Sequence, residues 1–360
     1  MIGALEGPWW TGLAAVTAAF WLVTAFRVIR GMAGVGFLRD EPPVSPGDAP
    51  RVSVCVAARN EEDKVARGVR SMAELDYPGL EVVAVDDRSE DATGRVLEEL
   101  AGEYDCLRVL HVGELPRGWL GKNHALQRAV DAADGEVLLF TDAVVVFRPD
   151  ALSRAVGCLL REDLDHLTAA PDLRMPGPLL EAFAGCFQVL FTRFAEPWRA
   201  RDPESDRHVG IGAFNLVRRD VYRAAGGHRA IRRRPDDDMR LARALRQSGA
   251  RADIRYGTGI LEVPWYGSLR EAVRGLSRSA WPGLDYSLSA AAGAAAVTLA
   301  VDVWPWIGWV ATAGPARWLN LAAALLSALL FVGATRYSST RAWLAVLWPV
   351  TGTLFVWILL

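Results

Sequence analysis

The side chains best suited to chemistry in this chain are carboxylates that gather in four short clusters. Three clusters lie in 59–62, in 86–89 and at Asp142, and the fourth is the run 236–238. Carboxylates on separate loops suit a nucleoside diphosphate, because one can hydrogen-bond the base or ribose while another holds a divalent cation against the phosphates. The pattern therefore favours a nucleotide-binding site.

The run Asp236-Asp237-Asp238 has two possible uses. It opens a helical pattern that continues to Gln247, and an acidic side chain there would stabilise the positive end of the helix. Capping needs only one of the three acids. Repulsion between adjacent carboxylates should raise the pKa of at least one of them, as a general base requires. Capping and proton transfer both stay open.

Strand and helix patterns alternate around the first three clusters. We expect strands at 51–57, 80–85, 107–111 and 136–141. We expect helices over 91–102 and 122–133, and a further helix that follows residues 59–62 and ends at 74. This alternation predicts an α/β fold with a parallel, doubly wound sheet, which binds ligands beyond the carboxyl ends of its strands. Residues 57–61 contain no glycine, which argues against a dinucleotide-binding turn.

The composition excludes several classes of protein. The residues AVILMFWYC make up 51% of the 360, and the mean hydropathy of +0.15 is too high for an ordinary soluble enzyme. Charged residues are 23%, which excludes intrinsic disorder and a wholly buried membrane bundle. The net charge of -2 offers no basic face, so we expect no nucleic-acid partner. The only lysines are Lys64 and Lys122.

Four apolar stretches predict membrane-spanning helices, at 9–26, 287–314, 318–335 and 342–360. A cleaved signal peptide is disfavoured for the first, because no basic region precedes it and no A-x-A site follows it. Arg27, Arg30 and Arg39 follow this stretch, so the positive-inside rule predicts an external N-terminus and a cytoplasmic region after it. We expect a multi-pass protein of the plasma membrane.

These features divide the chain into four predicted parts. They are an N-terminal transmembrane anchor at 1–30, a proline-rich linker at 31–50, a catalytic domain at 51–285 and C-terminal transmembrane helices at 286–360. Asp302 falls inside the second span, either as a functional intramembrane carboxylate or as an interfacial residue. Residues 177–198 predict an amphipathic helix that lies on the membrane or on the protein core.

Five motifs, in order, resemble those of family 2 inverting glycosyltransferases. They lie at 52–62, 83–93, 118–125, 140–143 and 237–241. The segment Gly118-Trp-Leu-Gly-Lys122, with one N-terminal and several C-terminal spans, is most similar to the membrane-bound branch that glycosylates lipids, including the hopanoid-associated, carotenoid and ceramide types. The resemblance implies a GT-A fold, a nucleotide-sugar donor, with a UDP-sugar favoured, a lipid acceptor, and transfer with inversion.

The resemblance also implies roles for individual residues. Asp238 matches the carboxylate that deprotonates the acceptor hydroxyl, and Asp237 is the second candidate. The implied donor contacts are Ala57, Arg59, Glu61, Asp87, Lys122 and Asp142. The implied acceptor side comprises Gly212, Ala213, Phe214, Arg278 and Trp281.

The chain departs from the family pattern at two places. The family's DxD motif reads Asp142-Ala143-Val144 here, so Asp142 is left as the metal ligand and binding of Mg²⁺ or Mn²⁺ is in question. The QxxRW motif of processive members is replaced by the segment 274–281, which favours transfer of a single sugar.

Three functions follow from these observations. The leading one is an integral-membrane glycosyltransferase that acts on a lipid or lipid-linked hydroxyl. A second is sugar transfer to polyprenyl phosphate. The third, motivated by Val144, is a catalytically silent membrane scaffold.

Overall fold

The computed structural model describes residues 5–359, without the side chain of Ser279. The chain forms two compact units. The first, here called the sheet unit, comprises Val35–Asp172 and Pro197–Pro264. The second, the helical unit, comprises the chain up to Gly34, Leu173–Glu196 and the chain from Trp265 onward. The predicted catalytic domain at 51–285 is therefore divided between the two units.

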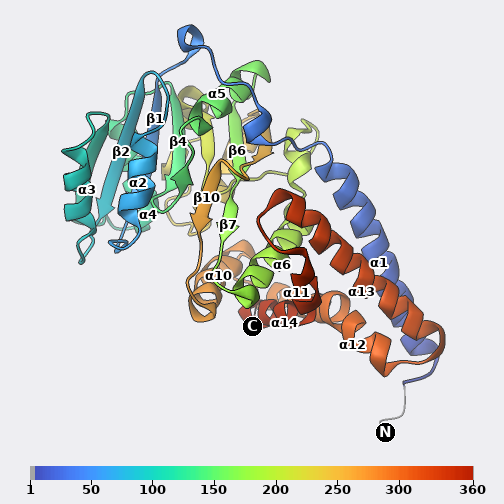
Figure 1. Cartoon of the computed structure of the whole chain (residues 1–360). Helices are drawn as coiled ribbons and strands as arrows, with labels where there is room; N and C mark the ends of the chain where they lie inside the picture. Colours follow the sequence, from blue (N-terminus) through green and yellow to red (C-terminus); the bar gives the residue numbers. More distant parts are fainter. Residues whose placement is uncertain (1–4, 360) are drawn as a thin grey trace. The chain divides into compact units, whose positions relative to one another are not determined.

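The sheet unit is built on a seven-stranded sheet in the order β3-β2-β1-β4-β8-β6-β9. Figure 1 shows β2, β1 and β4 side by side. β1 to β4 are parallel, as predicted, whereas β8 runs antiparallel to both β4 and β6. The strands are β1 (Val52–Ala58), β2 (Leu80–Asp87), β3 (Leu107–Val112), β4 (Val137–Asp142), β6 (His166–Ala170), β8 (Asn215–Arg218) and β9 (Ala252–Tyr256).

Amphipathic helices connect these strands. In α2 the buried side chains Val65, Val69 and Met72 recur at helical spacing, which gives the helix one apolar face to bury. The other helices of this unit are α3 (Thr93–Ala101), α4 (Gly121–Ala132), α5 (Ala151–Arg161), α7 (Arg219–Ala224), α8 (Gly227–Ala230) and α9 (Asp237–Gln247), and α2 spans Val65–Ala73. Short elements are η1 (Leu38–Asp40), η2 (Pro46–Asp48), η3 (Pro197–Arg201), β5 (Val146–Phe147), β7 (Asp172–Arg174) and β10 (Leu261–Pro264).

The loops after β1 and β2 hold each other in place. Asn60 and Arg88 adopt left-handed backbone conformations, with φ of 54° and 57°, which turn the chain sharply after each strand. The Asn60 backbone N–H donates to Ser89 Oγ at 3.1 Å, and the Glu90 N–H donates to Asn60 Oδ1 at 2.8 Å. Two of the predicted polar clusters therefore meet at the carboxyl edge of the sheet, as expected.

Within residues 5–359, the helical unit contains four helical segments long and apolar enough to cross a membrane. They are Pro8–Met32, Leu288–Ala311, Gly314–Tyr337 and Ala342–Leu359, close to the predicted stretches. Figure 1 shows α1 and α13 side by side. The helices of this unit are α1 (Pro8–Met32), α6 (Pro178–Ala195), α10 (Leu269–Gly283), α11 (Leu288–Thr298), the π-helical η4 (Leu299–Val303), α12 (Trp304–Ala311), α13 (Gly314–Ala334), η5 (Thr335–Tyr337), η6 (Ala342–Leu347) and α14 (Trp348–Leu359).

Helix α6 is the amphipathic helix predicted at 177–198. Its buried side chains belong to the apolar core of the helical unit, where the rings of Phe183 and Phe355 stack with centroids 4.6 Å apart. Glu181 near its first turn forms an ion pair with Arg341 at 2.6 Å. Helix α6 therefore packs against α14 and the start of η6.

Asp302 lies in η4 and is completely buried. Arg193 of α6 donates to both of its carboxylate oxygens, at 2.9 and 3.0 Å, and the guanidinium also lies over the rings of Phe20 and Trp21. Trp21 Nε1 donates to the carbonyl of Val301 at 2.6 Å. Asp302 therefore takes part in a buried, bidentate ion pair within the helical unit, which explains how a carboxylate can be buried there.

Candidate active site

The β2 strand end places Asp87 against the first turn of α4. Asp87 is 4% exposed, and its two carboxylate oxygens accept hydrogen bonds from the Arg88 guanidinium at 2.8 and 3.1 Å. A Cβ added to Gly121 would lie 3.1 Å from Asp87 Cγ and 2.8 Å from Arg88 Nη2, and closer still to Asp87 Oδ2. The glycine therefore lets helix α4 begin directly against this ion pair.

Glu61 stands at the end of β1 in a partly buried position. Its Oε2 atom is buried and has no hydrogen-bond partner among residues 5–359. Burial, together with the charge of Asp142, raises the pKa of Glu61 to about 7. Because β1 and β4 are neighbouring parallel strands, with Ala57 paired to Asp142, their carboxyl ends lie at the same edge of the sheet.

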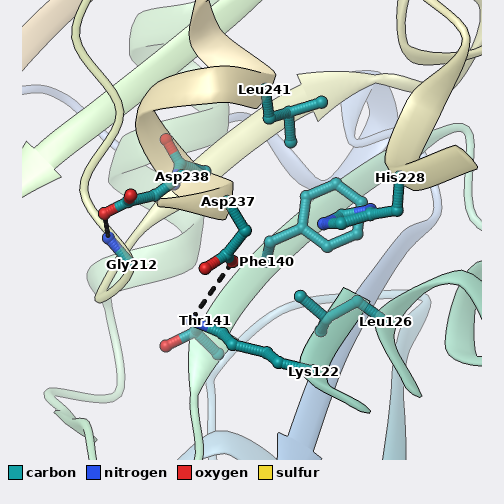
Figure 2. A pocket seen from close by; sticks show the side chains of 10 residues that line it. Lys122, Leu126, Phe140, Thr141, Gly212, His228, Asp237, Asp238 and Leu241 are labelled. Carbon is teal, nitrogen blue, oxygen red and sulfur yellow. Dashed lines mark hydrogen bonds and ion pairs between the residues drawn. The ribbon is translucent and has the colours of Figure 1, made fainter. Parts of the chain in front are cut away.

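Lys122 joins two of the predicted clusters. Its Nζ atom lies 2.8 Å from Asp142 Oδ1 and 3.2 Å from Asp237 Oδ2, so one ammonium bridges the end of β4 and the start of α9. Figure 2 shows the Asp237 carboxylate pointing toward this lysine. Burial opposes the charged ammonium, but attraction to Asp142, Asp237 and Asp238 dominates and raises the pKa of Lys122 well above its ordinary value.

Asp238 follows in the first turn of α9. Its Oδ2 accepts a hydrogen bond from the Gly212 backbone N–H at 2.9 Å, as Figure 2 shows, and its Oδ1 accepts from the Met239 N–H at 2.7 Å. Burial, together with the charge of Asp237, raises the pKa of Asp238 to about 7. The raised pKa expected somewhere in the acidic run is thus found here.

The other two acids of the run have different environments. Burial raises the pKa of Asp237, although Lys122 acts in the opposite direction. Asp236 makes no side-chain cap hydrogen bond and instead forms ion pairs with Arg234 and Arg240 at 2.9 and 2.8 Å. Capping by Asp236 therefore does not explain the acidic run.

A small pocket lies beside these carboxylates. Its polar wall carries Lys122, Asp237 and Asp238. His228 lies on the other side, with its ring 4.7 Å from Phe140 and its Nδ1 2.8 Å from Tyr222 Oη, and burial lowers its pKa to about 3. Sequence reasoning missed this neutral histidine, because no motif marks it. The full lining is Lys122, Leu126, Phe140, Thr141, Gly212, Asn215, His228, Asp237, Asp238 and Leu241.

The predicted acceptor-side residues fall in different places. Gly212 lines the pocket, and its carbonyl accepts a hydrogen bond from the Asp142 N–H at 3.1 Å. Ala213 and Phe214 are buried and do not line it. Arg278 and Trp281 lie on α10 of the helical unit. The acceptor roles of these residues stay predictions.

The remaining predicted donor contacts lie near the strand ends. Ala57 pairs in register with Val85 of β2 and with Asp142 of β4, and Arg59 is exposed in the loop after β1. Contact of either residue with a donor stays a prediction. Arg88, which occupies the oxygens of Asp87, was not predicted as a site residue.

A divalent cation does not fit the carboxylates as they are arranged. In the described part of the chain, no three His, Cys, Asp or Glu side chains converge as a metal site would require. Mg²⁺ and Mn²⁺ prefer several oxygen ligands, but Lys122 already engages Asp142 and Asp237, and Val144 supplies a hydrocarbon side chain. The residues present provide a lysine at the place where a metal was expected.

The mixed α/β sheet with carboxylates at its carboxyl edge is of the GT-A-like class. Residues 53–226 match the family described as Glycosyl transferase family 2, and the chain belongs to glycosyltransferase family 2. The fold is similar to a mannosyltransferase from Pyrobaculum calidifontis solved in complex with GDP-Man and Mn²⁺, with a TM-score of 0.59, 21% identity and 97% of each chain covered.

Two curated relatives are similar over part of the chain. The Beta-monoglucosyldiacylglycerol synthase of Trichormus variabilis is 33% identical over 42% of this chain and 34% of its own length. The 4,4'-diaponeurosporenoate glycosyltransferase of Staphylococcus aureus is 25% identical over 51% of this chain and 48% of its own length. The chain thus spans half or less of these relatives.

Proposed function

We propose that this protein is an integral-membrane glycosyltransferase that moves a sugar from a nucleotide-sugar donor to a hydroxyl group of a lipid, with inversion. The observation that carries the proposal is the juxtaposition in one pocket of Asp238, whose pKa is raised to about 7, with the Lys122 bridge between Asp142 and Asp237. A carboxylate that titrates near neutral pH is suited to general-base work.

The proposed reaction is a single displacement. The acceptor oxygen attacks the anomeric carbon while Asp238 takes the hydroxyl proton. The bond between that carbon and the diphosphate oxygen breaks, and its electron pair stays on the leaving diphosphate. Attack from the face opposite the leaving group inverts the anomeric centre. Lys122 supplies positive charge for the leaving group in the same pocket.

The donor would lie along the carboxyl edge of the sheet. Asp87 ends β2, and Glu61 lies in the loop after the neighbouring parallel strand β1, at the edge where sheets of this kind bind ligands. We propose that both contact the nucleoside and that the donor is a UDP-sugar. The Mg²⁺ or Mn²⁺ expected at Asp142 would neutralise the diphosphate if it bound, but the arrangement of Lys122 does not favour it.

The proposed acceptor is apolar. The names of the two curated relatives refer to a diacylglycerol lipid and a diaponeurosporenoate, which supports a lipid substrate for this chain. Four helical segments apolar enough to span a bilayer support the same proposal. We further propose a multi-pass protein of the plasma membrane with its sheet unit in the cytoplasm, based on Arg27, Arg30 and Arg39 after the first span.

The test is transfer by the full chain in detergent. Labelled UDP- and GDP-sugars are incubated with a membrane lipid extract, and the products are extracted and identified by mass spectrometry. We expect an acid-stable glycolipid. The general-base variant Asp238→Asn should lower the rate by about 10² to 10⁴, whereas the same change at the exposed Asp105 should not.

Three results would contradict the proposal. An acid-labile product would identify polyprenyl phosphate as the acceptor. Nucleotide binding without any turnover would favour the silent scaffold. Full activity in Asp238→Asn would remove this residue from the mechanism.

A further inference from the structure

We infer that Lys122 takes the place of a divalent cation in this transferase, so that the donor diphosphate binds and leaves without a bound metal. This inference rests on the proposed transferase function. The family comparison led us to expect a metal at Asp142, but the side chains around it supply a fixed ammonium instead.

The first step of the argument is geometric. Lys122 Nζ lies between Asp142 Oδ1 and Asp237 Oδ2, at 2.8 and 3.2 Å. An ammonium has three N–H donors, and these carboxylates account for two of them, which leaves the third for a ligand oxygen. The Lys122 side chain is 41% exposed, which leaves part of it open to a phosphate even though the surrounding protein partly desolvates the ammonium.

The second step concerns the ligands a metal would need. The Asp238 oxygens already accept backbone hydrogen bonds from Gly212 and Met239. Position 144 carries valine, so the second carboxylate of a DxD arrangement is missing. A divalent ion near Asp142 would also be repelled by the ammonium that lies 2.8 Å from its Oδ1. Metal binding would therefore require Lys122 to leave.

The third step is that Lys122 is held in place. It lies in the first turn of α4, beside the buried Asn123, whose Nδ2 donates to the carbonyls of Ile231 and Arg234 at 2.9 and 2.8 Å. These bonds fasten the start of α4 to the segment that leads into α9 and Asp237. The lysine is thus fixed relative to its carboxylate partner by neighbouring backbone and does not depend on a metal for its position.

Two arginines lie against the same turn, which comprises Gly118 to Lys122. The Arg233 guanidinium reaches Gly118, where an added Cβ would lie 3.3 Å from Nη2, and Gly118 has a φ of +85°. Arg88 lies against Gly121, where an added Cβ would be 2.8 Å from Nη2. These glycines leave room for both guanidinium groups beside the start of α4.

Three cations, Lys122, Arg88 and Arg233, gather at this turn. Asp142 and Asp237 pair with Lys122, Asp87 pairs with Arg88, and Asp238 also acts on Lys122. The cations offset part of the negative charge of these carboxylates and so reduce the repulsion that a diphosphate would meet. When the bond to the sugar breaks, the electron pair stays on the diphosphate oxygen, Lys122 keeps its proton and donates a hydrogen bond to that oxygen, and the acceptor's proton goes to Asp238.

The experiment measures nucleotide affinity of the full chain in detergent by calorimetry, with UDP and GDP, in EDTA and in Mn²⁺. We expect the wild-type protein to bind one nucleotide in EDTA within about threefold of its affinity in Mn²⁺. Lys122→Met should weaken binding in EDTA by about tenfold or more, because it removes a charge-assisted hydrogen bond. Lys64→Met is the matched control at the chain's only other lysine, which is exposed; its charge acts on Glu61, so we expect a change in affinity of less than about threefold.

A second pair of variants tests the missing ligand. Because Lys122 would repel a divalent cation beside Asp142, the test is made without it. Val144→Asp in a Lys122→Met background should bind nucleotide more strongly in Mn²⁺ than in EDTA by about tenfold, whereas Val144→Asn in the same background should not. Wild-type binding that disappears in EDTA and returns with Mn²⁺ would overturn the inference and leave the transferase proposal intact. Unchanged affinity of Lys122→Met in EDTA would also overturn it. Failure of the wild type to bind any nucleotide under both conditions would overturn the transferase proposal itself.

Discussion

Replacement of Gly121 by alanine should damage the donor site through a steric clash. An added Cβ would lie 3.1 Å from Asp87 Cγ, 2.8 Å from Arg88 Nη2 and closer still to Asp87 Oδ2. Ordinary carbon–oxygen contacts are about 3.4 Å or longer, so the buried Asp87 carboxylate has to move by about 1 Å. Alanine in a helix favours folding by about 1 kcal/mol over glycine, but overpacking of this kind costs about 1–3 kcal/mol.

The cost of the clash should therefore exceed the gain in helix propensity, and the displaced Asp87 should contact the nucleoside poorly. Loss of one hydrogen bond to a charged group, about 1.5–3 kcal/mol, corresponds to a nucleotide affinity weaker by about 10- to 150-fold. The assay is calorimetric nucleotide binding, together with the apparent unfolding midpoint in detergent. Gly113→Ala is the matched control, because its added Cβ meets nothing within 4 Å. Wild-type affinity in Gly121→Ala would refute the reasoning that Asp87 is held rigidly against α4.

Three further perturbations follow from the geometry. Because the pKa of Asp238 is raised to about 7, kcat/KM should rise with pH through about 7 as the base ionises, and a flat pH–rate profile would contradict this. The same shift means that the folded state holds a proton that the unfolded chain releases, so the free energy of unfolding should fall as the pH rises from about 4 to about 7. Arg193→Met leaves Asp302 buried without its partner and should cost about 3–5 kcal/mol, with partial recovery in the double variant with Asp302→Asn, measured by unfolding in detergent. Asn123→Ala leaves the carbonyls of Ile231 and Arg234 without their donor, so it should destabilise the protein by about 1–3 kcal/mol and weaken nucleotide binding. Unchanged affinity would show that these two hydrogen bonds do not help to position Lys122 for the nucleotide.

The strand ends were predictable from the sequence because local pattern and sheet topology agree there. A β-branched run followed by polar residues specifies both β1 and the cluster after it, and the predicted bounds differ from Val52–Ala58 by one residue at each end. Parallel strands put their carboxyl ends at one edge, so the meeting of the loops after β1 and β2 follows from the alternation of elements alone.

Other features depend on contacts that no local pattern records. The four-residue strand β8 inserts antiparallel between β4 and β6, and a segment this short carries too little periodicity to reveal its direction. The ion pair between Lys122 and Asp237 joins residues distant in the sequence, and His228 enters the pocket from a helix of four residues. The place of α6 in the helical unit likewise depends on aromatic packing with α14.

The type of cation at position 122 is itself informative. The chain uses arginine for nearly all its basic residues, since only two of the 40 are lysines. A guanidinium is a planar group that can donate two hydrogen bonds to one carboxylate, as Arg88 does to Asp87 and Arg193 does to Asp302. An ammonium is a compact charge whose three donors diverge, so it can join two carboxylates on different elements and keep a donor for a third oxygen. This geometry lets Lys122 join Asp142 and Asp237 and still face a diphosphate, which gives a physical reason for a lysine at this position. A guanidinium can also pair with two carboxylates, as Arg255 does with Glu41 and Asp253, so the distinguishing property of Lys122 is its compact charge with a third donor.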